Sequence, residues 1–264
     1  MSVLPTKQTF GERSRPFRWL LERELLRIYK LWTQTIIAPV VSSFLFILVF
    51  GLSLGDRIKA IDGVTYDVYI VPGLIAMAMV QSSFSNSSTS VFQARFDRYI
   101  HDILAAPMRT WEINLGMALG GVLRGLTIGI LLLLASLFVV DVPVREPGFL
   151  ILAVLVLLVM FSFFGVVVGL YAESFDHHQF VNNIILLPLT FLGGVFYSVN
   201  SLSPIWEAVT HANPIFYLVQ TVRYGFLGRS DVDPWLALGV TTVMAIVALV
   251  WSSYLFATGK RLKA

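Results

Sequence analysis

Residues that could act as catalysts are few in this sequence, and their spacing does not assemble an enzyme site. The segment Gly51-Leu52-Ser53-Leu54-Gly55 matches the G-x-S-x-G pattern of a catalytic serine, which needs a strand, a sharp turn, and a histidine and an acid nearby. Here the pattern ends a hydrophobic run, so we interpret Gly51 and Gly55 as helix-packing residues. His177 and His178 are adjacent, which on a helix directs their side chains about 100° apart and suits metal chelation poorly.

A phosphate-binding loop is also missing from the sequence. The pair Gly259-Lys260 has Tyr254 where the first glycine of such a loop should stand, and Arg261 where a serine or threonine should follow. The sequence contains no cysteine, which excludes thiolate metal sites and cysteine nucleophiles. We therefore expect this chain to bind no cofactor or metal of its own and not to be an enzyme.

A charged segment lies between two long apolar runs, from Ala94 to Trp111. Its apolar residues recur at helical spacing, at positions 96, 99, 100, 103 and 104. We interpret it as a short helix along the cytoplasmic membrane face, which receives force from a soluble partner and passes it to the two spans it joins. An ordinary polar loop is the alternative. The residues expected to make the contact are Arg95, Phe96, Asp97, Arg98, Tyr99, His101, Asp102 and Ile103.

The composition is that of a polytopic membrane protein. Hydrophobic residues make up 56% of the 264 residues and charged residues 13%, both far from the values of soluble domains. The net charge of +3 could indicate nucleic-acid binding, but a basic excess beside membrane spans is more typical of membrane topology. We therefore expect membrane lipids as partners and no nucleic acid.

The hydrophobic pattern predicts an all-α protein with six transmembrane helices, each close to the ~20 residues that cross a bilayer. An even number places both termini on one side. Thirteen Lys and Arg lie in segments 1–34, 93–112 and 257–264, against five in the segments facing the other side, so the termini are predicted to be cytoplasmic. The six-span domain covers 35–256 and the tail 257–264, with spans at about 35–55, 69–92, 113–140, 149–171, 179–199 and 236–256.

The amino-terminal segment 1–34 is predicted to form an amphipathic helix at the membrane interface. Leu21, Leu25, Ile28 and Trp32 fall on one stripe, and charged residues lie away from it. Its aromatic residues suit headgroup depth.

The second predicted span changes from apolar to polar halfway along its length. From residue 81 to 90 nearly every residue is Gln, Ser, Asn or Thr, and such groups at membrane depth need other helices or a water-filled path. The alternative is that small residues merely allow close helix contact. We interpret this band, with two asparagines of the fifth span, as the lining of a translocation path: Gln81, Ser82, Ser85, Asn86, Thr89, Asn182 and Asn183.

The third predicted span is suited to tight packing, because its glycines recur at positions 116, 120, 121, 125 and 129. Arg124 lies among them and is expected to snorkel or to pair with Asp102 or Glu112.

The last third of the chain is predicted to contain irregular and re-entrant elements. Pro188 and Gly193-Gly194 predict an irregular outer half of the fifth span. In the outer segment 200–235, Pro204 begins a short helix and Asn213-Pro214 separates it from a second one. That second helix carries an apolar stripe, which predicts that it re-enters the outer leaflet or caps a pathway.

Several stretches, in order along the chain, resemble the permease subunits of ABC-2 type transporters. They are Phe50-Gly51, YIVPGLIAMAMV at 69–80, the FxxxxxxDILAAPM region at 96–108, LPLTFLGGVFYSVNSLSP at 187–204 and NPIFYLVQTVRYGFLG at 213–228.

This resemblance implies an export permease in the bacterial inner membrane, acting as a homodimer with two copies of an ABC ATP-binding subunit that holds ATP and Mg. The amino-terminal helix and the segment Arg95 to Leu104 would contact the ATPase, and spans one, two and five would line the path. The substrate would be a drug, lipid or glycan.

A stand-alone secondary transporter or channel is the alternative function. It would normally couple ions through an intramembrane acid or histidine, and the predicted spans contain none outside their ends. A membrane enzyme is disfavoured because no nucleophile, metal set or acid pair converges.

Overall fold

The structure is a computed structural model that describes residues 10–55, 60–61 and 63–262, with side chains described for 15–51, 60–61 and 63–262. Segment 1–34 is thus seen from residue 10 and the tail 257–264 to residue 262, and the surroundings of Ser53 and Gly55 lie outside the described part. The elements are α1 (Phe10–Lys30), the π-helical η1 (Thr33–Ile37), α2 (Ala38–Gly55), α3 (Tyr66–Phe96), α4 (Ile100–Ala105), α5 (Thr110–Ser136), α6 (Pro147–Tyr171), α7 (Phe175–Phe180), the π-helical η2 (Val181–Leu186), α8 (Leu187–Phe191), the 3-10 turn η3 (Val199–Ser201), α9 (Pro204–Ala212), α10 (Pro214–Leu227) and α11 (Pro234–Thr258).

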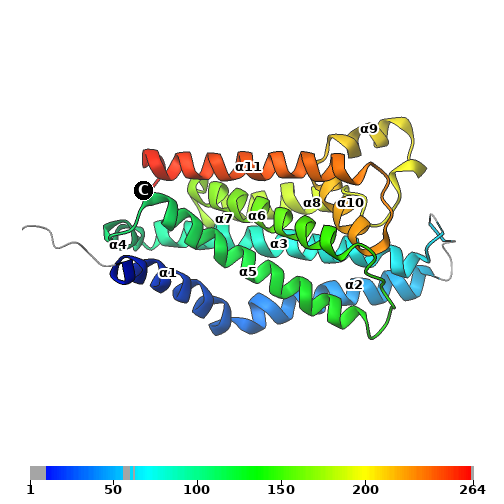
Figure 1. Cartoon of the computed structure of the whole chain (residues 1–264), viewed down its shortest axis with the longest axis horizontal. Helices are drawn as coiled ribbons and strands as arrows, with labels where there is room; N and C mark the ends of the chain where they lie inside the picture. The colour runs from blue at the N-terminus through cyan, green and yellow to red at the C-terminus, as the bar shows by residue number, and fades with distance from the viewer. Residues whose placement is uncertain (1–9, 56–59, 62, 263–264) are drawn as a thin grey trace, which may run out of the picture.

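Five helical stretches are long and apolar enough to cross a membrane, which confirms the predicted all-α polytopic fold. They are Thr33–Gly51 in η1 and α2, and the helices α3, α5, α6 and α11. The helices run along one long axis, with the start of α1, α4 and the end of α11 at the same end of the bundle (Figure 1). α3 is the central helix, because 83% of its most apolar window is buried, against 11% for Thr33–Gly51.

The predicted fifth span, 179–199, is not a continuous helix. Helical structure runs from α7 through η2 and α8 but ends at Phe191, and turns lead from there to residue 198. Gly194 has a φ of +72°, a conformation that favours glycine, and therefore the helix cannot continue through it. The prediction of an irregular outer half is confirmed, while the count of continuous spans among the described residues is five rather than six.

Glycines let the central helices approach one another closely. A Cβ at Gly121 of α5 would lie 2.6 Å from the carbonyl oxygen of Ser83 on α3, and a Cβ at Gly165 of α6 would lie 2.5 Å from the carbonyl oxygen of Phe84. A Cβ added at Gly51, from the serine-like pattern, would lie 3.6 Å from the Cβ of Asp67 on α3. The predicted glycine packing of the third span is therefore present, and side chains larger than hydrogen would push α3 and its neighbours apart.

The two predicted short helices are present and lie toward the end of the bundle opposite α4 (Figure 1). α9 begins at Pro204 and α10 at Pro214, where Asn213 accepts a hydrogen bond from the Ile215 backbone N–H and so caps α10. The apolar stripe of α10 is buried in the same apolar cluster as the middle of α3. The stripe thus packs on the protein's own core.

Candidate coupling surface and polar pathway

The charged segment forms a turn and a short helix at the end of the bundle where α1 begins. α3 ends at Phe96, Arg98 has a φ of +63° in the connecting turn, and α4 starts at Ile100. Ile100 and Ile103 are buried in an apolar cluster with residues of α5, α6 and α11. Except for Arg95, the remaining predicted contact residues are wholly or partly exposed beside them. The exposed or half-buried residues are Phe96, Asp97, Arg98, Tyr99, His101 and Asp102.

Arg95 does not belong to this exposed surface. Its side chain is buried, and Nη1 donates hydrogen bonds to the backbone oxygens of Gly169 (3.1 Å) and Ala172 (3.0 Å) at the end of α6. A guanidinium at this place satisfies carbonyls that have no partner within the helix and favours the negative end of the helix dipole. Arg95 therefore fixes the end of α3 to the end of α6.

A buried carboxylate joins the amino-terminal helix to the bundle, and the amphipathic pattern did not predict it. Glu24 of α1 is 1% exposed; its Oε1 accepts hydrogen bonds from Ser90 Oγ (2.7 Å) and Arg23 Nη2 (2.6 Å). Arg27 lies 3.0 Å from Oε2 of Glu24 and also donates to the backbone oxygen and Oδ1 of Asn86, both at 3.0 Å. This charge can be buried because Oε1 accepts two hydrogen bonds and Oε2, which has no hydrogen bond, faces the Arg27 cation.

The residues of α1 that are buried against the rest of the protein are not those of the predicted apolar stripe, except for Ile28, which belongs to both. Leu20, Glu24 and Ile28 are buried, whereas the predicted Leu21 and Leu25 are only partly covered and Trp32 is 54% exposed. The physical reason is that Gly116 and Gly120 of α5 offer room to Leu20 and Glu24. The helix is thus rotated by about one residue from the apolar stripe.

The polar band of α3 has two faces with different surroundings. Ser82, Asn86 and four further serines are buried against neighbouring helices, with Asn86 and Ser87 beside Gly120 and Gly121. Gln81, Ser85 and Thr89, spaced four residues apart, remain half-exposed along one stripe. Of the predicted lining residues on α3, these three lie on the face that can meet a solute.

The two asparagines of the interrupted span lie in η2, which packs against α3. Asn182 Nδ2 donates to Asn183 Oδ1 at 3.1 Å, and Asn183 is exposed. Asn182 Oδ1 and Gln81 Nε2 are both buried without a hydrogen-bond partner. Unpartnered amide groups on two packed elements can each hold water or a polar solute group, as a pathway requires.

His178, one residue before the predicted fifth span, is buried against α3. Its Nε2 is in hydrogen-bond contact with Ser88 Oγ, and its ring lies 6.1 Å from the ring of Phe92. Burial lowers the pKa of His178 below its ordinary value of 6.5, because the charged form loses hydration. The neutral imidazole therefore docks α7 onto α3.

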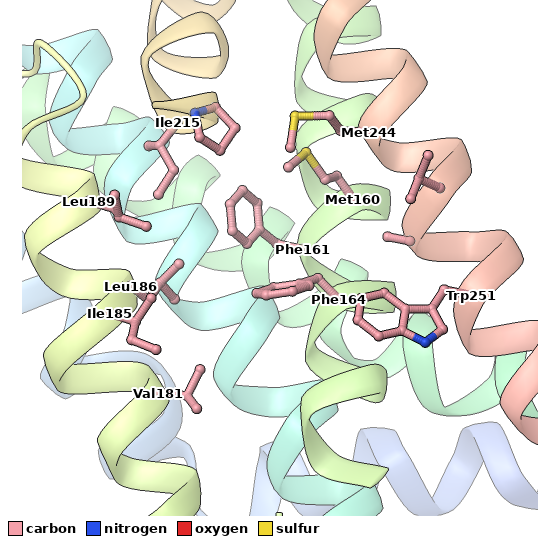
Figure 2. Close-up of a pocket in the computed structure, with 13 residues that line it drawn as sticks. Met160, Phe161, Phe164, Val181, Ile185, Leu186, Leu189, Ile215, Met244 and Trp251 are labelled. Carbon is pink, nitrogen blue, oxygen red and sulfur yellow. The ribbon is translucent and has the colours of Figure 1, made fainter. Parts of the chain in front are cut away.

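An apolar cavity of about 280 Å³ lies between the interrupted span and the helices α6 and α11 (Figure 2). Val181, Ile185 and Leu189 face it from one wall, and α6 and α11 form the opposite wall. No hydrogen bond crosses the cavity among the residues that line it, so little but apolar contact resists movement of η2 relative to α6 and α11.

Two arginines in the membrane domain have neutral partners. Arg124 Nε donates to the backbone oxygen of Thr35 at 2.9 Å, which corrects the expectation of a pair with Asp102 or Glu112. Arg223, 1% exposed, donates to the backbone oxygen of Gly194 at 2.7 Å and stacks on Tyr69 at 4.0 Å. This second contact ties α10 to the irregular turn after α8; the sequence carried no signal for it beyond an arginine among apolar residues.

Comparison with known proteins identifies the protein family that this chain matches. The model of the ABC-2 type transporter family matches residues 15–227. The chain is 40% identical over 232 residues to the inner membrane transport permease YadH of Escherichia coli (strain K12), covering 87% of this chain and 91% of that protein. It is also 25% identical over 230 residues to nodulation protein J of Neorhizobium galegae, covering 85% and 86% of the two chains. A third relative, nodulation protein J of Rhizobium meliloti (strain 1021), is 24% identical over 241 residues, covering 87% of this chain and 89% of that protein.

Proposed function

The chain belongs to the ABC-2 type transporter family, and from this we propose that it is the permease subunit of an ATP-driven exporter in a bacterial inner membrane. As a member of that family it is the membrane component of a transporter and not the catalytic part. We propose that ATP and Mg²⁺ bind to a separate ABC ATP-binding subunit, and that two such subunits work beside two copies of this chain. Both termini would lie in the cytoplasm, where the basic segments concentrate.

The observation that supports this function best is that the charged segment exposes its polar side chains while two of its isoleucines are buried in the helix bundle. Phe96, Arg98 and Asp102 are open to a partner, while Ile100 and Ile103, 1% and 8% exposed, are packed into the bundle. A force applied to α4 would therefore reach α5 and α6 directly through side-chain contact. Arg95 would carry it to α6 as well, since its hydrogen bonds join α3 and α6.

The same proposal assigns the transport path to the half-exposed stripe of α3 and to the start of η2. Gln81, Ser85, Thr89 and Asn182 offer amide and hydroxyl groups on an otherwise apolar surface. In a homodimer a second copy would present the same stripe, and the substrate would pass between the two copies. These groups can bind a drug, a lipid headgroup or a glycan, so the substrate is proposed only as one of these classes.

Charge reversal on the exposed surface tests the coupling. The full chain is expressed with a tag together with the ATPase subunits of the same bacterium, purified in mild detergent, and analysed for co-purifying chains and ATP hydrolysis. Asp102→Lys should reduce recovery of the ATPase at least tenfold, since opposed like charges cost on the order of 1–3 kcal/mol at a partly desolvated contact. Asp141→Lys is the matched control, because Asp141 is also exposed and lies on the loop between α5 and α6 at the other end of the bundle (Figure 1).

Recovery of this chain alone, without ATPase activity in several detergents, would refute the motor-driven proposal and favour a stand-alone transporter. Equal recovery with both variants would place the contact elsewhere.

A further inference from the structure

A groove of about 650 Å³ runs between one face of α1 and Tyr99 of the charged segment 94–111. On α1 its lining residues recur at helical spacing, and the opposite wall is Tyr99. The lining residues are Trp19, Glu22, Arg23, Leu26, Arg27, Lys30, Leu31 and Tyr99. Arg23 and Arg27 on this face contact the buried Glu24, so the groove lies where α1 meets the bundle.

The charge of the groove is positive and only partly compensated. Arg23 and Arg27 share the carboxylate of Glu24, whereas Lys30 forms no ion pair among the described residues. Arg27 Nη1 is buried and has no hydrogen-bond partner. Glu22 is the one carboxylate among the lining residues named, and counting the buried Glu24 behind it, three cations face two carboxylates. A negatively charged group of one unit would balance the site.

The apolar part of the groove is exposed in the manner of a membrane-contacting surface. Trp19, Leu26 and Leu31 are 70%, 55% and 47% exposed, and Leu31 lies two residues before the first candidate membrane span, which starts at Thr33. In water such a surface would be costly, whereas beside lipid it contacts acyl chains. Aromatic and basic residues together on such a helix are typical of the headgroup layer.

We propose that this groove binds a negatively charged glycerophospholipid from the surrounding inner leaflet, with the phosphate at Lys30 and Arg27 and an acyl chain along Leu26 and Leu31. A phosphate suits the site because guanidinium and ammonium donors form charge-assisted hydrogen bonds with its oxygens. Zwitterionic lipids fit less well, since their cationic end adds to the positive charge. The bound lipid bridges α1 and Tyr99, whose ring already lies 5.0 Å from the guanidinium of Arg23.

The test is native mass spectrometry of the full chain in detergent, titrated with dioctanoyl phosphatidylglycerol or with dioctanoyl phosphatidylcholine. Phosphatidylglycerol should bind more tightly, and 0.5 M salt should weaken it. Lys30→Gln should weaken phosphatidylglycerol binding about fivefold, the effect of one basic residue near an anionic lipid surface. Lys30 is chosen because its side chain forms no hydrogen bond or ion pair within the described part of the chain, so the variant should fold as the parent does.

Arg18→Gln is the matched control, since Arg18 is an exposed cation of α1 outside the groove lining. It should leave phosphatidylglycerol affinity within a factor of two. The proposal is overturned if both lipids bind equally, if both variants weaken binding equally, or if inorganic phosphate at millimolar concentration displaces the lipid completely. That last result would assign the groove to a soluble phosphate compound.

Discussion

Replacing Glu24 by alanine tests whether the amino-terminal helix is held on the bundle by a buried charge. The change removes two ion-pair contacts and the hydrogen bond from Ser90, and it leaves Arg27 facing Asn86 without its carboxylate. Breaking a buried pair by removing one partner costs about 3–5 kcal/mol. The side chains of Arg23 and Arg27 are 36% and 23% exposed and can regain hydration, so we expect the lower end, about 3 kcal/mol.

This free energy should appear as local opening of α1 while the rest of the fold remains. Since 1.4 kcal/mol is a tenfold change, amide exchange in residues 20–30 should accelerate about a hundredfold, whereas peptides from α6 should exchange as in the parent protein. Hydrogen–deuterium exchange of the detergent-purified chain, read by mass spectrometry, measures both at once.

Glu22→Ala is the control on the same helix. Glu22 is exposed and forms no ion pair among the described residues, so its removal should change exchange in α1 less than threefold. The reasoning is refuted if Glu24→Ala leaves exchange in α1 unchanged, or if Glu22→Ala accelerates it equally.

Two further predictions concern packing and pH. Gly121→Ala should lower the thermal denaturation midpoint by about 5 °C, because the new Cβ would lie 2.6 Å from the Ser83 carbonyl oxygen and overpacking costs about 1–3 kcal/mol; Gly148→Ala, with nothing within 4 Å, should shift it by less than about 1 °C. The lowered pKa of His178 means that the folded state binds fewer protons than the unfolded state, so His178 contributes stability above about pH 6.5 that is lost as the pH falls below that value. His178→Gln should therefore make the midpoint fall less steeply between pH 7.5 and 5.5 than in the parent; identical slopes would contradict the buried neutral imidazole.

The long helices and their glycine contacts could be predicted because they depend on local composition. A run of apolar residues near bilayer length specifies a span, and glycines four residues apart specify close approach. The interruption of the fifth span could be predicted in kind, because Gly194 favours a left-handed backbone conformation through which a helix cannot continue; Pro188, by contrast, lies in the first turn of α8 and the helical structure continues through it. Its π-helical turn at 181–186 could not, since nothing in the propensity of these residues distinguishes it from an α-helix.

Buried charges were the part that sequence patterns could not place. Amphipathic spacing assigns charged residues to the exposed face, yet Glu24 and Arg95 are buried because their partners come from α3 and from the end of α6. Those partners are 66 and 74 residues away in the chain, so no local window contains both halves of either contact. Arg95 was predicted to lie on the contact surface, whereas in the structure it is buried and connects the end of α3 to the end of α6.

In the polar band of α3, the structure distinguishes side chains that only pack against other helices from those that could line the proposed path. Ser83 donates to the backbone oxygen of Met79 at 2.7 Å, and Asn86 accepts from Arg27; neither side chain points to open space. What remains is the half-exposed stripe of Gln81, Ser85 and Thr89, too narrow to surround a solute by itself. A path built on this stripe needs a second wall, and a second copy of the chain would supply an identical one. In the proposed homodimer the polar surface for transport would be completed between two chains, and a helix that is 83% buried over its apolar window could then still take part in moving a substrate.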